Sequence, residues 1–342
     1  MADIKQTVKS LALRSARILA WVREEYETGL PIPLRKKLFL WSRGFYSKTA
    51  VLHNFDENDV NLYLSNFSRI FRTSQINQYS DMLWNKLSCH FMLQSLFKDV
   101  VPVVIAAVSR GKLVGIDIQE KDILTWTCEY LQSGHRVFAK PIEGSKGKNA
   151  KVISTADELR KWIVGNDGYM LCELIESHPY SSEIFPHSLN TIRILSIVDD
   201  SGPYIVAAVH RFGNKDSAPV DNWSSGGLAA PIDLDSGILS EATMNPVFTS
   251  GDLKRCKTHP DTGAVIEGAV IPNWPQVCRS IARMAEQLAF LPYLGWDIAI
   301  APDGGFRVVE INSNTDINIL QIAKPLLSDE RLRRFYEFHR VI

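Results

Sequence analysis

Two acidic residues and an asparagine near the carboxyl end of the chain have the types and spacing of a magnesium site. Residues 295–312 read GWDIAIAPDGGFRVVEIN, and the Asp-Gly dipeptide between alternating apolar residues predicts a β-hairpin. A turn centred on that dipeptide places Asp297 directly across from Glu310, with Cβ atoms about 5 Å apart. Asn312 then lies on the same face, because side chains alternate along a strand.

Opposed carboxylates in an apolar strand pair indicate a bound cation. They repel each other in a desolvated site unless positive charge lies between them. Carboxylate and amide oxygens are hard ligands, which suit magnesium better than zinc. The alternative, a solvated strand pair with incidental acids, fits poorly because the two strands are otherwise apolar. The same face carries Ala299 and Val308. The opposite face is expected to be mostly core and to hold Trp296, Ile298, Ile300, Arg307, Val309 and Ile311.

A strand and a glycine loop further upstream could hold nucleotide phosphates. Residues 137–148 read VFAKPIEGSKGK, a strand that ends at Lys140 and a loop that contains Ser145 and Gly147. Glycines let backbone N–H groups approach phosphate closely, and lysines neutralise its charge. The pattern is not a Walker loop. Residues 169–176, YMLCELIE, form an apolar strand whose edge could hold an adenine ring; a plain buried strand with a polar end is the alternative.

The elements that must position these motifs alternate between helix and strand from about residue 79. Apolar spacing predicts the following elements: helices at 80–97, 119–133, 155–164 and 275–290, strands at 101–107, 136–140, 150–154, 169–175, 190–198 and 203–211, and the hairpin at 294–312. Residues 1–78 are expected to be helical, with one helix that begins at Asp56 or Asn58 and extends through Phe71.

We therefore expect three parts along the chain. Residues 1–78 form a helical N-terminal extension, 79–327 form the main α/β region, and 328–342 form a C-terminal helix. Within the main region, residues 135–180 grip the nucleotide and residues 181–327 carry magnesium and substrate.

Composition excludes several classes of function. The 342 residues carry 38 basic and 38 acidic side chains, so the formal net charge is zero and nucleic acid is not expected as a partner. The five cysteines form no C-x-x-C pair, which argues against a disulfide framework or zinc cluster and favours the cytoplasm. No apolar run reaches the ~18 residues of a membrane span. Residues 4–22 are basic and amphipathic; we favour a helical cap on the main body or a dimer surface over a helix lying on a membrane.

The order of these pieces resembles the ATP-grasp superfamily, over residues 80–327. The step from Asp297 to Glu310-x-Asn312 resembles that of D-alanine–D-alanine ligases. The middle of the chain is similar to amino-acid-adding ligases related to the enzyme that glutamylates a ribosomal protein. Within the superfamily, residues 188–193 (SLNTIR) and 220–222 (VDN) resemble most the sugar-transfer-associated ATP-grasp group. The pieces that carry the resemblance are Lys86, Lys140-Pro141, Glu173, Arg193, Arg211, Asn222, Gly226-Gly227, Asp297, Glu310 and Asn312.

The resemblance implies an α/β (α+β) ATP-grasp fold, in which two α/β subdomains grip ATP, with an N-terminal helical extension. It implies these roles for residues. ATP would be bound by Lys86, Lys140, Ser145, Gly147, Glu173 and the backbone of Ile175. Magnesium, as two ions with Mn²⁺ as the alternative metal, would be bound by Asp297, Glu310 and Asn312, with Glu310 bridging. Catalysis would fall to Arg193, at an acyl phosphate, and Arg211, while substrate would contact Asn222, Gly226 and Gly227.

One departure from the family pattern concerns charge. D-alanine–D-alanine ligases carry an arginine two residues before the hairpin aspartate, where this chain has Gly295. The charge must then come from elsewhere, which favours Arg193. The alternative for Arg193 is a structural ion pair with Glu173, Glu183 or a hairpin acid. Two acids, Glu176 and Glu183, are both candidates for the residue that binds the ribose hydroxyls.

The implied activity is that of an ATP-dependent carboxylate–amine ligase, which forms an amide through an acyl phosphate and releases ADP. Its partners would be a small-molecule carboxylate and an amine, such as a sugar acid or an amino acid, in polysaccharide or peptide tailoring; an oligomer is compatible with this activity. The alternatives are a kinase or phosphotransferase on the same scaffold and a non-catalytic nucleotide-binding protein. A metal-dependent hydrolase based on His178, His187 and His210 ranks last, because their spacing fits no zinc pattern.

Overall fold

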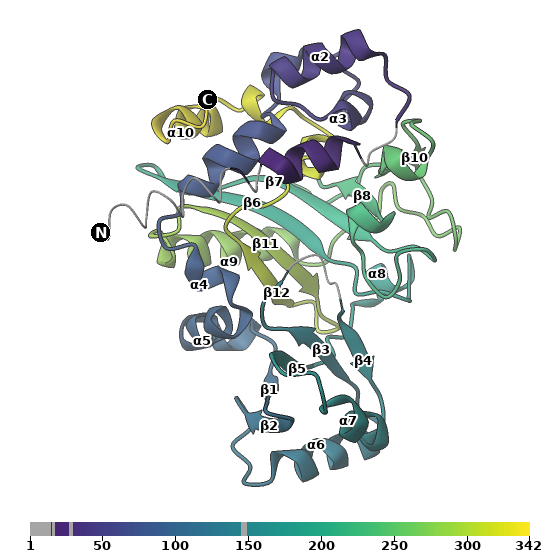
Figure 1. Cartoon of the computed structure of the whole chain (residues 1–342), viewed down its shortest axis with the longest axis vertical. Helices are drawn as coiled ribbons and strands as arrows, with labels where there is room; N and C mark the ends of the chain where they lie inside the picture. Colours follow the sequence, from purple (N-terminus) through teal and green to yellow (C-terminus); the bar gives the residue numbers. More distant parts are fainter. Residues whose placement is uncertain (1–14, 16–17, 27–29, 145–148) are drawn as a thin grey trace.

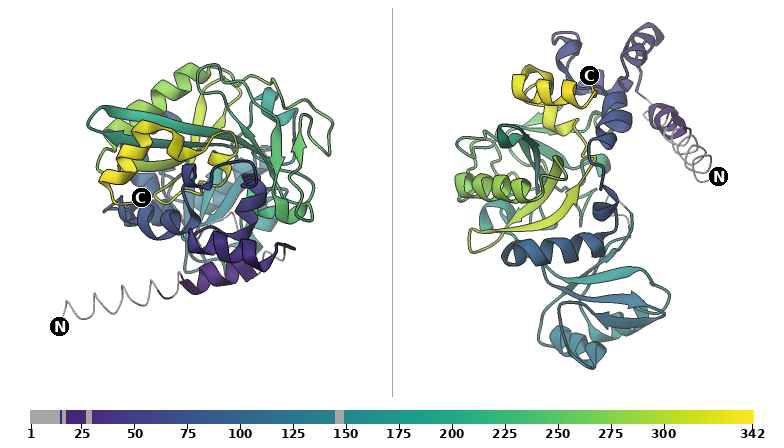
Figure 2. Two further views of the ribbon diagram at one scale, coloured as in Figure 1. Left: turned by 90° about the horizontal axis from the view of Figure 1, so that it is seen from above. Right: turned by 90° about the vertical axis from the view of Figure 1, so that its left-hand side faces the viewer.

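Two antiparallel sheets and a set of N-terminal helices follow one another along an elongated molecule. The computed structural model describes residues 15, 18–26, 30–144 and 149–342. The smaller sheet lies at one end of the molecule, the larger sheet in the middle and the N-terminal helices at the other end (Figure 1). The view from the side in Figure 2 shows the same order. The amphipathic stretch 4–22 lies largely outside the described residues.

The smaller sheet has five strands in the order β2-β1-β5-β3-β4. Their bounds are β1 Val104–Ser109, β2 Lys112–Gly115, β3 Val137–Pro141, β4 Lys151–Ile153 and β5 Tyr169–Glu173. Helices α6 (Ile123–Gln132) and α7 (Ala156–Trp162) cover one face and bury Leu131 and Leu159 against it. Both helices begin at a side-chain cap, Asp122 for α6 and Thr155 for α7, which accepts a hydrogen bond from a backbone N–H three residues on. Apart from β2, which the sequence did not predict, these elements agree with the predicted pattern, with shifts of a few residues at their ends.

The larger sheet has seven strands in the order β10-β9-β8-β7-β6-β11-β12. Their bounds are β6 Ile192–Asp199, β7 Gly202–Phe212, β8 Leu228–Pro231, β9 Ala242–Met244, β10 Arg255–Cys256, β11 Tyr293–Ile300 and β12 Phe306–Asn312. Side chains of β6 alternate between two cores. Ile192 and Ile194 pack in the core that includes α9 (Trp274–Gln287), whereas Leu195 and Ile197 pack in the core that includes α10 (Glu330–Phe338).

The N-terminal segment, by which we mean residues 18–78, departs from prediction. Its described helices are residues 18–26, α2 (Leu34–Ser42), α3 (Ser47–Leu52) and short turns at Val60–Leu62, Ser68–Arg72 and Thr73–Gln75. The continuous helix expected from residue 56 or 58 through Phe71 is wrong. Tyr63 is extended, and Leu64 bonds through both its N–H and its carbonyl to the side chain of Gln321. Tertiary contacts therefore override the helical apolar spacing of this stretch.

Helices α4 (Asp81–Trp84) and α5 (Lys86–Phe97) link the N-terminal segment to the smaller sheet. Asn85 caps α5 by accepting a hydrogen bond from the N–H of Ser88, which places Lys86 at the first turn of the helix. None of the helices in the described parts of the chain is both long and apolar enough to cross a membrane.

His210 is a fully buried part of the β7 core rather than a metal ligand. Its Nε2 lies 2.7 Å from the hydroxyl of Tyr180, and its ring stacks on Phe212 with centroids 4.2 Å apart. Among the described residues, no group of three or more His, Cys, Asp or Glu side chains is arranged to hold a metal ion. The histidine-based hydrolase therefore finds no support here.

We expect acid to destabilise the protein through His210. Burial lowers its pKa to about 3, so the unfolded chain binds the proton first as the pH falls below its ordinary pKa. The free energy of unfolding should then fall by about 2 kcal/mol per such histidine between pH 7 and pH 5. His210→Gln should lower stability at pH 7 but flatten this slope, measured by chemical denaturation. The exposed His135→Gln is the control, and identical slopes in both variants would contradict the prediction.

Candidate active site

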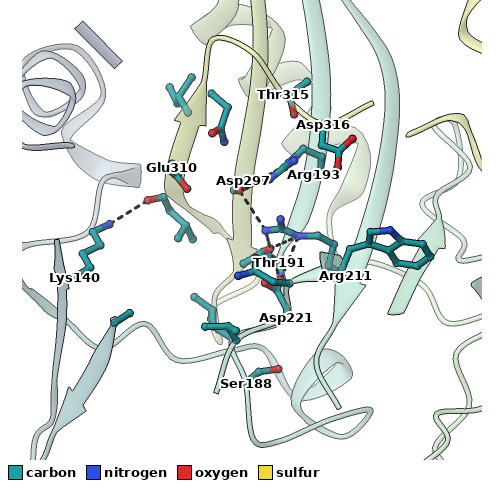
Figure 3. A pocket seen from close by; sticks show the side chains of 18 of the residues that line it. Lys140, Ser188, Thr191, Arg193, Arg211, Asp221, Asp297, Glu310, Thr315 and Asp316 are labelled. Atoms are coloured by element: carbon teal, nitrogen blue, oxygen red, sulfur yellow. Dashed lines mark hydrogen bonds and ion pairs between the residues drawn. The ribbon is translucent and has the colours of Figure 1, made fainter. Parts of the chain in front are cut away.

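A large cavity lies between the two sheets and reaches the N-terminal segment. Its volume is about 1190 Å³. Most of the candidate site residues line it: Lys86, Lys140, Glu173, Ile175, Arg193, Arg211, Asn222, Asp297, Glu310 and Asn312. Figure 3 shows Lys140 on one side of this cavity, Glu310 facing it, and the arginines and Asp297 farther along the larger sheet. The structure thus brings together residues that are up to 226 positions apart in sequence, from Lys86 to Asn312.

Two lysines from the smaller sheet's side form one end of the site. Lys140, on β3, points its Nζ at the carbonyl of Val309 on β12, 3.4 Å away, so it bridges the two sheets. Lys86 Nζ donates to the carbonyl of Gly144 at 2.5 Å. Burial lowers the pKa of Lys86, while the carboxylate of Glu310 opposes that shift. Both lysines therefore line the cavity on the side of the smaller sheet, where their charge could neutralise phosphate.

The hairpin register confirms the predicted opposition of its two acids. Asp297 pairs with Glu310, but a bulge follows at once, and Ile298 pairs with Val308. The extra residue on β12 reverses the predicted faces beyond that point: Val308 is buried in the core that includes α9, whereas Val309 is only half-buried. The uninterrupted alternation expected from sequence is wrong there, because a bulge shifts every later side chain to the other face.

The negative charge of Asp297 is compensated by two guanidinium groups, and it does not need a metal ion for this. Arg193, its neighbour on β6, donates from Nε to Oδ1 at 2.5 Å and from Nη2 to Oδ2 at 2.8 Å. Arg211 Nη2 lies 3.3 Å from Oδ2. Burial raises the pKa of Asp297, but Arg193 and then Arg211 outweigh burial and hold that pKa below its ordinary value. Asp297 is thus the hairpin acid that a structural ion pair of Arg193 would use, which was the alternative to a catalytic role for this arginine.

Arg211 is fixed by a second buried acid. Its Nε lies 3.5 Å from Asp221 Oδ2, and both Nε and Nη2 donate to the hydroxyl of Thr191. Thr191 in turn donates to Asp221. Two arginines and two aspartates therefore form a paired network in the wall of the cavity, in which each guanidinium is oriented by a carboxylate.

The backbone at Gly295 leaves no room for a side chain. A Cβ built on Gly295 would lie 2.3 Å from Thr315 Cβ and 2.4 Å from its hydroxyl oxygen, so no side chain fits. Arg193 supplies a guanidinium from the neighbouring strand instead, at the register position of Asp297. The positive charge next to Asp297 therefore comes from β6.

Glu310 and Asn312 fit a hard divalent cation better than Asp297 does. Asp297 is engaged by guanidinium groups, whereas no hydrogen bond or ion pair between described residues occupies the Glu310 carboxylate. Asn312 Nδ2, a hydrogen-bond donor, is buried without a partner among the described residues, so a ligand acceptor could use it; the oxygen of the same amide is the atom that would face a cation. A carboxylate and an amide oxygen on the cavity wall suit Mg²⁺.

An apolar wall beyond the lysines could accept a nucleobase. Val104, Met170 and Cys172 pack together on the cavity side of the smaller sheet. Glu173 accepts the N–H of Val103 at 3.0 Å, so its carboxylate is partly used by the start of β1. Of the two acids open for ribose, Glu176 lines the cavity, and the exposed Glu183 is not among its lining residues.

Four candidate residues are not placed at the cavity. Ser145 and Gly147 lie outside the described residues. Gly226 and Gly227 do not line the cavity. Gly226 has φ 102°, and a Cβ on Gly227 would lie 2.8 Å from the carbonyl oxygens of Asp221 and Phe212, so both glycines serve a tight backbone turn behind Asn222.

Comparison with known proteins identifies the family. The family model described as sugar-transfer associated ATP-grasp matches residues 74–335. The chain belongs to this family. The fold of this ATP-grasp protein therefore agrees with the α/β (α+β) ATP-grasp prediction. A comparison with curated proteins finds no match.

Solved ATP-grasp ligases are distantly similar to this ATP-grasp chain. A structure of PsnB with a minimal precursor shares 14% identity, with 75% of this chain and 62% of that chain covered and a TM-score of 0.41. D-alanyl-alanine synthetase A from Vibrio cholerae shares 10% identity over 75% and 63% of the two chains, with a TM-score of 0.45. L-amino acid ligase from Bacillus licheniformis shares 10% over 72% and 42%, with a TM-score of 0.37. The chain covers less than two thirds of each of these structures.

The sequence interpretation missed several residues of this ATP-grasp site. Thr191 and Asp221 lie within the two stretches that carried the family resemblance, which was the available signal. No signal in the sequence indicated the other missed residues, which are Thr315, Asp316 and the cavity residues of the N-terminal segment. They join the site only through loop conformation and tertiary packing.

Proposed function

We propose that the protein is an ATP-dependent carboxylate–amine ligase that forms an amide through an acyl phosphate. One observation carries the proposal: from one end to the other, a single cavity is lined by two lysines, a glutamate that pairs with no other described residue, and two buried arginines. Lysines suit the phosphates of ATP, and fixed guanidinium groups suit the charge that develops at a transferred phosphoryl group.

The proposed reaction has two steps. A carboxylate oxygen of the first substrate attacks the γ-phosphorus of ATP, the bond to the β-phosphate oxygen breaks, and ADP leaves. The amine nitrogen of the second substrate then attacks the acyl carbon, loses a proton, and displaces inorganic phosphate. No protein nucleophile is required, so the protein contributes position and charge.

Named residues would divide this work. Lys86 and Lys140 would hold phosphate oxygens. Glu310 and Asn312 would hold magnesium, which neutralises phosphate charge when bound. Arg193, oriented by Asp297, would place its guanidinium at the acyl phosphate, and Arg211 would hold a substrate carboxylate or share that role.

The family description favours a substrate from sugar metabolism. It links the family to sugar transfer, which supports a sugar acid as the carboxylate and polysaccharide or peptide tailoring as the setting. A screen of carboxylates against amines tests the proposal, with ADP release and product masses measured. An amide product supports a ligase; a product that keeps one phosphoryl group would instead identify a kinase or phosphotransferase.

Lys140→Ala is expected to weaken ATP binding by about tenfold or more and to leave adenosine binding unchanged, because a charge-assisted hydrogen bond to phosphate is lost. Isothermal titration of both ligands measures this difference. The exposed Lys121→Ala is a control that changes the same charge elsewhere. Equal losses for ATP and adenosine in Lys140→Ala would show that the lysine only connects the two sheets.

A further inference from the structure

The N-terminal segment builds part of the cavity wall. Arg69 donates from Nε to the carbonyl of Thr315 at 3.1 Å and from Nη2 to that of Asn314 at 3.0 Å. Asn66 Nδ2 donates to Asn318 Oδ1 at 3.0 Å. These residues precede residue 74, where the family match begins. The shape of the loop after β12 thus depends on a segment outside the matched region.

The same segment closes the end of the cavity that lies away from the lysines. Its cavity-lining residues are Glu24, Tyr46, Lys48, Thr49, Leu52, Asn66 and Arg69. In Figure 3, Thr315 and Asp316 lie near Arg193 and far from Lys140. In the same view, the order from Lys140 is Glu310, Arg193 and then Asp316.

Asp316 is an ionised carboxylate, and one of its two oxygens has no partner among the described residues. Its Oδ1 accepts the N–H of Asn318 at 3.0 Å, and no hydrogen bond or ion pair between described residues engages Oδ2. Burial raises its pKa, but Arg69 and weaker contributions hold that pKa below the ordinary value. The nearby cations have other direct partners: Lys48 pairs with Glu24, and Arg69 bonds the two carbonyls.

The residue before Asp316 packs against the hairpin rather than offering a second polar group. Thr315 is 1% exposed, and its hydroxyl lies over Gly295 with no hydrogen-bond partner among the described residues. Asp316 therefore supplies the negative charge at this end of the cavity.

We propose that Asp316 binds the ammonium group of the amine substrate, in a subsite closed by the N-terminal segment. The inference rests on the proposed ligase activity and names the place of its second substrate. An ionised carboxylate is the side chain that pairs with an ammonium group, and this one lies past Arg193 from the phosphate end. Before it reacts, an ammonium group held there gives one proton to the adjacent Asp316 carboxylate. The free amine nitrogen then bonds to the acyl carbon as inorganic phosphate leaves.

The test measures binding of the amine separately from formation of the acyl phosphate. Asp316→Asn keeps an oxygen for the Asn318 N–H and removes only the charge. The amine found in the substrate screen should then show a KM raised about 10- to 100-fold, as expected for the loss of a charged hydrogen bond. Hydroxylamine is uncharged at neutral pH and needs no anionic partner, so hydroxamate formation from the same carboxylate should stay within about twofold.

Two further variants complete the experiment. Asp316→Glu keeps the charge and should restore most of the amine affinity, while the exposed Asp235→Asn should change neither reaction. An unchanged amine KM in Asp316→Asn, or an equal fall of amide and hydroxamate formation in it, would overturn the inference. Failure of the ligase proposal looks different: the wild-type protein would form neither amide nor hydroxamate with any carboxylate.

Discussion

Glu310→Gln is expected to lower turnover by at least about 100-fold while the protein stays folded. Its carboxylate has no hydrogen bond or ion pair with another described residue, so the exchange breaks no contact of the fold. It also removes repulsion from Asp297, which lies directly across the hairpin. The melting temperature should therefore change by no more than about 2 °C. What is lost is the negative charge that would hold magnesium against the phosphates.

ADP release at saturating magnesium measures this effect. The exposed Glu286→Gln on α9 removes the same charge away from the cavity and should keep full activity. Near-normal ADP release by Glu310→Gln would show that its carboxylate holds no essential metal. A large loss of melting temperature would show a structural role instead.

Arg193→Lys is expected to lower the rate by about 10²- to 10³-fold, the usual cost of one lost transition-state donor. Lysine keeps the positive charge beside Asp297, so the buried carboxylate is not left unpaired. It cannot reproduce the planar fork that bonds both oxygens of Asp297 and still presents an N–H to the cavity. The substitution therefore keeps the positive charge at position 193 but loses the fixed orientation of its hydrogen-bond donors.

A melting curve and ADP release on the same sample decide between the two roles of Arg193. A catalytic role predicts a small change in melting temperature and a large loss of activity per folded molecule. A large loss of melting temperature with activity per folded molecule preserved would make Arg193 a structural partner of Asp297 alone. Arg333→Lys, on the exposed face of α10, should alter neither quantity.

The sequence predicted those parts of the site that follow from local rules. The Asp-Gly dipeptide predicted the hairpin, and Asp297 does pair with Glu310 as expected. Nearer the turn, the observed pairs such as Ile298–Val308 are one residue out of the expected register, and the bulge restores that register at Asp297. A hairpin acid was one of the partners considered for a structural ion pair of Arg193, and Asp297 is that acid.

The parts that failed depend on contacts between distant segments. The bulge after Asp297 changed which of Val308 and Val309 is buried, and no residue type in the hairpin indicates it. Opposed acids were expected to need a metal, but Arg193 is the register neighbour of Asp297 on a third strand, and sequence could not supply that pairing. The contacts of Arg69 with the loop after β12 span about 245 residues.

Formation of an acyl phosphate is the central claim, and hydroxylamine trapping tests it most directly. The wild-type protein would be incubated with ATP, magnesium, hydroxylamine and each carboxylate in turn, and ADP and hydroxamate would be quantified together. We predict equal amounts of ADP and hydroxamate for the true carboxylate, none without it, and a drop of both in Glu310→Gln. ADP released with a phosphorylated product and no hydroxamate would contradict the account.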